Sequence, residues 1–169
     1  MRKFGSLVSL LALAACSQDP SVSGSSYVRI EGDWTSNPPD EPIREAVASA
    51  TALLFLPDGT FVEHHFYVRD SDGVQSISSG DPHLTAIGRW TEDSGSVTVS
   101  RAKVARTVPE SPGPDSLCAK SLVATVISPS AIRFGKETFA RSATGIGSIS
   151  AHEPYVRDAQ RGVDCGDGV

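Results

Sequence analysis

The feature that most constrains the fold of this chain is a series of short β-like segments separated by turn residues. The segments are rich in β-branched and aromatic residues, which is typical of strands. The expected strands are 27–35, 50–56, 60–68, 84–91, 95–101, 121–128, 131–134 and 137–141. This spacing predicts an all-β fold, a small antiparallel meander of about eight strands that closes into a barrel. A β-sandwich is the alternative.

The clearest turn lies at residues 56–60, between the second and third expected strands. Pro57 restricts φ, Asp58 can bond to its own backbone, and Gly59 can take the positive φ that a hairpin needs. We therefore expect a hairpin here.

The strand expected at 60–68 has two chemically different faces. One face carries Val62, His64, Phe66 and Val68, and the other carries Phe61, Glu63, His65 and Tyr67. The first set is the more apolar, so we expect it to point into the barrel. His64 is then a core histidine, and the adjacent His65 lies on the opposite face.

The N-terminal residues have the order of a secretory signal. Arg2 and Lys3 precede the apolar run 4–13, which is too short to cross a hydrocarbon core of ~30 Å as a helix. Small residues follow, and cleavage as an ordinary signal peptide is the competing interpretation.

The segment Leu13-Ala14-Ala15-Cys16 resembles the lipobox of bacterial lipoproteins. This resemblance implies removal of residues 1–15 and acyl chains, such as palmitate, on the Cys16 thiol. Two or more chains give stable membrane anchoring. Ser17, in place of the aspartate that retains many lipoproteins in the inner membrane, implies an outer-membrane protein that faces the periplasm.

The mature chain has room for one domain. We expect a flexible tether at 16–26, a barrel domain at 27–141 and a C-terminal tail at 142–169. The full chain has a net charge of −5 and no basic run, which argues against nucleic-acid partners. Cys118 and Cys165 form an even pair in an oxidising compartment, so we expect a disulfide that ties the tail back to the domain.

The helical signals are few. Ser150 and Glu153 have capping-box spacing and predict a short helix that ends near Gly162, although Pro154 is tolerated only in a first turn. Residues 41–48 are a weaker helical candidate. Two long connections, 69–83 and 102–120, are possible functional loops.

Several short motifs resemble those of small lipocalin-like domains of bacterial lipoproteins: Gly32-Asp33-Trp34, Asp58-Gly59-Thr60-Phe61, Gly88-Arg89-Trp90 and a late Arg141. The resemblance implies that Gly32 and Trp34 pack at the barrel base and that Arg141 covers the indole. It also implies a barrel that holds a small apolar ligand. An eight-stranded barrel can equally be filled by its own side chains.

No catalytic constellation is visible. The G-x-S-x-G motif of α/β-hydrolases is absent, and we expect no enzyme activity, cofactor or metal site. His83 or His152 could still be brought near His64 or His65 by folding. The leading hypothesis is a non-catalytic, lipid-anchored envelope protein that binds a small apolar ligand or another envelope protein. The alternatives are a structural or inhibitory lipoprotein that acts through its long loops, and a metal-binding lipoprotein.

Overall fold

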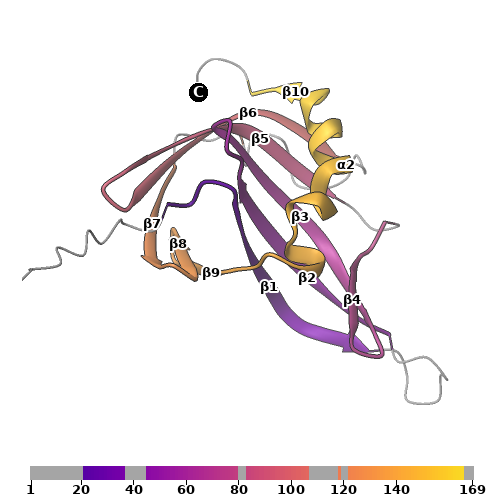
Figure 1. The fold of residues 1–169 in the computed structure, drawn as a ribbon. Helices are drawn as coiled ribbons and strands as arrows, with labels where there is room; N and C mark the ends of the chain where they lie inside the picture. Colours follow the sequence, from indigo (N-terminus) through magenta and orange to yellow (C-terminus); the bar gives the residue numbers. More distant parts are fainter. Residues whose placement is uncertain (1–20, 37–44, 80–82, 107–117, 119–121, 166–169) are drawn as a thin grey trace, which may run out of the picture.

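The structure, a computed structural model, describes residues 21–36, 45–79, 83–106, 118 and 122–165. Within these ranges the chain is mostly antiparallel β structure with a single α-helix (Figure 1). The strands are β1 (Ser25–Ser36), β2 (Glu45–Phe55), β3 (Thr60–Ser71), β4 (Val74–Ile77), β5 (Leu84–Asp93), β6 (Ser96–Arg106), β7 (Leu122–Ser128), β8 (Ala131–Phe134), β9 (Glu137–Arg141) and β10 (Val163–Asp164). A 3-10 helix, η1 (Gly145–Gly147), and the helix α2 (Ile149–Gln160) come between β9 and β10.

Eight of the strands form a closed barrel. Neighbours pair in the order β1-β2-β3-β5-β6-β7-β8-β9, and β9 pairs back with β1 opposite Tyr27 and Val28. β4 and β10 lie outside this ring, on β3 and β6. The predicted antiparallel barrel is therefore confirmed, and each predicted segment overlaps one barrel strand. The sandwich alternative is wrong, because the two edges of the sheet pair with each other.

The predicted hairpin between β2 and β3 is confirmed. The Leu56 amide donates to the Thr60 carbonyl over 2.9 Å, and Gly59 has a φ of +81°. The Thr60 amide also donates to the Asp58 carboxylate over 2.9 Å. The turn thus uses glycine for the positive φ and aspartate for the local bond.

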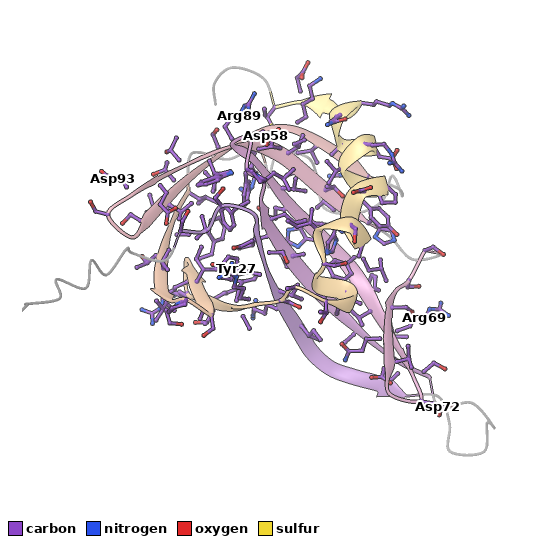
Figure 2. The ribbon with its side chains drawn as sticks, in the orientation of Figure 1. Tyr27, Asp58, Arg69, Asp72, Arg89 and Asp93 are labelled. Atoms are coloured by element: carbon purple, nitrogen blue, oxygen red, sulfur yellow. A yellow bond between two sulfur atoms is a disulfide. The ribbon has the colours of Figure 1, made fainter. Side chains whose placement is uncertain are left out.

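The barrel interior beside this turn is filled by side chains of its own strands. The buried cluster consists of Val22, Tyr27, Leu53, Phe55, Phe61, Val97, Val99, Ala124, Ile132 and Phe139. Figure 2 shows Tyr27 within this part of the barrel. The Phe55 ring meets Tyr27 and Trp90 edge to face at 5.9 and 5.8 Å. This end of the barrel is therefore a packed core.

The domain begins earlier than predicted. Val22 is fully buried in the interior cluster, and β1 starts at Ser25. The Gly24 amide donates to the Phe55 carbonyl over 2.8 Å. Residues 22–26 therefore belong to the domain rather than to the predicted tether at 16–26.

A second apolar cluster lies on the outer surface of the barrel wall. Its buried members are Ala50, Ala52, Leu54, Val62, Phe66 and Val68, with Ile146, Ile149 and Val156 of η1 and α2 packed against them. The prediction that this face of β3 points into the barrel is wrong, because Phe61 of the other face joins the interior cluster. Both faces of β3 are covered, so alternation alone could not distinguish them.

The predicted C-terminal helix is present with a different start. Ser148 is its N-cap and accepts from the Ala151 amide over 3.3 Å, so the predicted cap at Ser150 is wrong. Pro154 is the sixth helical residue, beyond the first turn where it was expected. The helix ends two residues before Gly162. Its packing on β5 and β6 holds it over the outer wall (Figure 1).

Three other predicted segments differ from the structure. Residues 45–48 belong to β2, so the helix predicted at 41–48 is wrong for that half, and 41–44 lie outside the described residues. The connection 69–83 contains β4, paired with the end of β3, and the connection 102–120 includes the last residues of β6.

In the described ranges, no helix has the length and apolar character that crossing a membrane requires.

Candidate functional site

Three histidines from distant parts of the chain meet beneath α2. His64 lies on the outer face of β3, His83 immediately precedes β5, and His152 is in α2. Their side chains are buried, with exposed fractions of 0, 3 and 0 %. Both His83 and His152 therefore reach His64, as the sequence allowed. We call His64, His83 and His152 the histidine triad.

The triad is a linear chain of hydrogen bonds. His64 Nδ1 lies 2.8 Å from His152 Nδ1, and His64 Nε2 lies 3.0 Å from His83 Nδ1. At one end His152 Nε2 is 2.8 Å from the Ile146 carbonyl oxygen. At the other end His83 Nε2 is 2.8 Å from the Ser78 carbonyl oxygen. All six ring nitrogens of the triad therefore have a partner.

Burial disfavours a positive charge on two of these rings. Burial, followed by the charges of His152 and His83, lowers the pKa of His64 to about 2. Burial also lowers the pKa of His152 to about 4. The Tyr155 ring stacks on His83 and is tilted against His64, with centroid distances of 4.4 Å to both. His64 and His152 are therefore neutral rings at physiological pH.

The triad does not have the geometry of a metal centre. Within the described part of the chain, no group of three histidine, cysteine, aspartate or glutamate residues could hold a metal ion. His64 presents Nδ1 to His152 and Nε2 to His83, which are opposite sides of one ring. A tetrahedral ion needs nitrogens that converge on one point. The triad is therefore a chain of rings rather than a chelate.

A cleft of about 430 Å³ opens between α2 and the β5–β6 wall, and His83 is one of the residues that line it. The side chains around it include Thr85, Ala105, Arg106, Tyr155, Asp158 and Arg161. Its size falls within the usual range for small-molecule sites, about 300–1,000 Å³. Burial raises the pKa of Tyr155, and the nearby Asp158 charge adds to this, so its phenol is a neutral donor. The cleft combines apolar walls with both signs of charge.

A second polar network, buried at Glu63 and Arg101, lies on the opposite, interior face of β3. Glu63 accepts from the guanidinium of Arg101 in β6, with Nε at 2.8 Å, and from His65 Nε2, also at 2.8 Å. His65 Nδ1 is 3.0 Å from the Thr51 hydroxyl. Burial alone would raise the pKa of Glu63, but the His65 hydrogen bond and the Arg101 charge outweigh it, so its pKa is lowered. Glu63 is therefore a buried, paired carboxylate.

Gly88 lies in β5, the strand between β3, which carries Glu63, and β6, which carries Arg101. It pairs with Phe61 on one side and with Arg101 on the other, at a register shift in β5–β6. A Cβ at this position would lie 1.7 Å from the Ser100 carbonyl oxygen. Only glycine fits this close approach of the β5 and β6 backbones.

The structure places the residues predicted from the sequence as follows. Cys118 and Cys165 form the predicted disulfide, with their Cα atoms 5.2 Å apart, and so tie the tail to the domain. Arg141 donates to the Ser25 hydroxyl over 2.6 Å and lies opposite Tyr27 in the β1–β9 pairing. The packing of Gly32 and of the Trp34 side chain, and Cys16 as a whole, lie outside what the structure describes. The barrel-base packing and the lipid anchor stay predictions.

Sequence reasoning missed the cleft, Tyr155 and the Glu63–Arg101 pair. The available signal was a pair of opposite charges on two expected strands, Glu63 in 60–68 and Arg101 in 95–101. No family model matches the chain, and no curated protein matches it. The geometry of the site therefore carries the functional argument.

Proposed function

We propose that this protein is a lipid-anchored, non-catalytic envelope protein that binds a small ligand in the cleft beneath α2. The observation that carries this proposal is the contrast between the interior cluster, filled by its own side chains, and the cleft of about 430 Å³ outside the barrel wall. The proposed ligand site is thus on the outside of the barrel, not in its interior.

The lining of the cleft favours a ligand with both apolar and polar groups. The Tyr155 ring and Val104 offer apolar contact, while Arg106, Arg161 and Asp158 offer charged contact. A site with mainly apolar walls and a few polar groups is typical of small-molecule binding. A non-catalytic role agrees with the partners of the triad, whose terminal nitrogens face backbone carbonyls rather than a nucleophile.

Native mass spectrometry of the protein purified from its own envelope tests the ligand site. We expect a small molecule that remains bound to the wild type and is lost from Ala105→Trp, which places an indole in the cleft. Thr98→Trp, at an exposed position of the same strand away from the cleft, is the matched control and should keep the ligand. An empty wild type, or retention by Ala105→Trp, would contradict the proposal. A bound protein would favour the alternative of a structural or inhibitory lipoprotein.

The membrane anchor rests on the Cys16 lipobox, with acyl chains that each contribute roughly 0.8 kcal/mol per buried methylene. We expect mass spectrometry of the mature N-terminus to show an acylated Cys16. Cys16→Ser should leave the membrane fraction, while Ser17→Ala should stay in it. An unlipidated N-terminus, or a Cys16→Ser protein that stays as firmly attached as the wild type, would disprove the anchor. Neither result would contradict the proposed ligand site.

A further inference from the structure

The histidine triad contains more hydrogen-bond contacts than three neutral imidazoles can supply with hydrogens. A carbonyl oxygen only accepts, so the ring nitrogens that face Ile146 and Ser78 must each carry a hydrogen. Each of the two nitrogen–nitrogen contacts also needs one hydrogen between its partners. The chain thus requires four hydrogens, and three neutral rings carry three.

We propose that the histidine triad is a buried binding site for one extra proton, which gives the three rings together a charge of +1. Starting from the Ile146 end, His152 carries its hydrogen on Nε2 and accepts on Nδ1. His64 then carries its hydrogen on Nδ1 and accepts on Nε2. His83 must therefore donate from both nitrogens, so it is the imidazolium.

The surroundings of His83 suit this assignment. His64 and His152, with pKa values lowered to about 2 and about 4, are the two rings that stay neutral. The face of Tyr155 stacks on His83 at a centroid distance of 4.4 Å, close enough for a cation–π contact. His83 also lines the cleft, which gives its proton a route to solvent.

Charged groups reach this site from each element packed around it. Asp158 lies on α2 and can partly balance the charge, while Arg161 at the end of α2 and Arg106 on β6 line the same cleft with positive charge. On β3, His65 adds a small electrostatic effect on His64, and Arg69 bonds to the Ser78 hydroxyl over 2.9 Å. Tyr155 is neutral. Among the described contacts, the proton on His83 is stabilised by the Ser78 carbonyl oxygen, by His64 Nε2 and by the face of Tyr155.

The extra proton predicts an unusual dependence of stability on pH. Three unfolded histidines with a pKa of about 6.5 bind one proton in total at about pH 6.8. Below this pH the three histidines bind more protons in the unfolded chain than in the folded triad, and above it they bind fewer. The contribution of the triad to stability therefore peaks near pH 6.8 and falls on both sides. A neutral triad would instead give a plateau above pH 7.

Long-range proton–nitrogen NMR of the folded, ¹⁵N-labelled protein at pH 7 tests the proposal directly. We expect His152 as the Nε2–H tautomer, His64 as the Nδ1–H tautomer and His83 with hydrogens on both nitrogens. Proton release on unfolding at pH 8 should be about one proton larger for the wild type than for His83→Gln, whereas His65→Gln should match the wild type. Three neutral rings in the folded wild type would overturn the proposal, whether or not His83→Gln folds.

Discussion

His64 and His65 are neighbours in the sequence, yet they belong to two polar networks on opposite faces of β3. Inside the barrel, His65 joins Glu63 and Arg101, a network with a fixed negative and a fixed positive charge. Outside the wall, His64 joins two other histidines, whose charge depends on how many protons are bound. One strand thus carries a network that pairs a carboxylate with a guanidinium and a network made of histidine rings alone.

The interior network should show the largest effect of a single substitution. Arg101→Met leaves the Glu63 carboxylate buried without its guanidinium, which costs about 3–5 kcal/mol in the free energy of unfolding. Urea denaturation measures this loss. The double variant Glu63→Leu/Arg101→Met, which removes both charges, should regain much of it. A single variant as stable as the wild type would show that the pair has no structural role.

The two networks should lose their contributions to the free energy of unfolding in different pH ranges. Since the pKa values of His64 and His152 are lowered, their contribution is complete above the unfolded value of about 6.5 and is lost as the pH falls below it. At pH 5 the loss is about 2 kcal/mol for each histidine. The lowered pKa of Glu63 means that its contribution is lost only at more acidic pH, as the pH falls through its folded-state value.

Unfolding free energies measured between pH 7 and pH 5 test this separation. Glu63→Gln should keep the decrease in this range, while His152→Gln should reduce it. A wild type whose stability is constant from pH 6.5 to pH 5 would contradict the assignment of neutral, buried rings to the triad.

The smallest expected effect comes from the helix that covers only one of the networks. Ser148→Ala removes the N-cap of α2 and should cost about 1 kcal/mol. Hydrogen exchange should increase in α2 but not in the strands around Glu63. Ser150→Ala, at the cap position predicted from the sequence, is the control and should change little. Equal effects of the two variants would show that Ser148 is not the cap.

The barrel could be predicted from the sequence because its strands and turns are local features. Pro57, Asp58 and Gly59 determine a hairpin by their own backbone preferences, and the disulfide followed from the number of cysteines. The faces of β3 could not be predicted, because both are buried and the residue types do not say whether a barrel core or a helix covers them.

The candidate site could be predicted only in part. Nothing in the local sequence brings His83 and His152 to the two sides of one ring, because their positions depend on barrel closure and on the packing of α2. The Ser148 cap was missed for a related reason. Ser150 has the better motif, but the helix begins at Ile149, which packs on the outer wall, and the local sequence does not reveal that contact.

The burial of Val22 has a consequence for how the molecule would sit in the envelope. Six peptide steps separate it from Cys16, and a fully extended chain of that length reaches only about 20 Å. With the acyl anchor that we propose, the end of the barrel that carries Asp58 would lie close to the lipid headgroups. The hairpin tip at Asp72, at the far end in Figure 2, would point away from the bilayer. With so short a connection, the cleft would stay near the membrane surface and would meet ligands there.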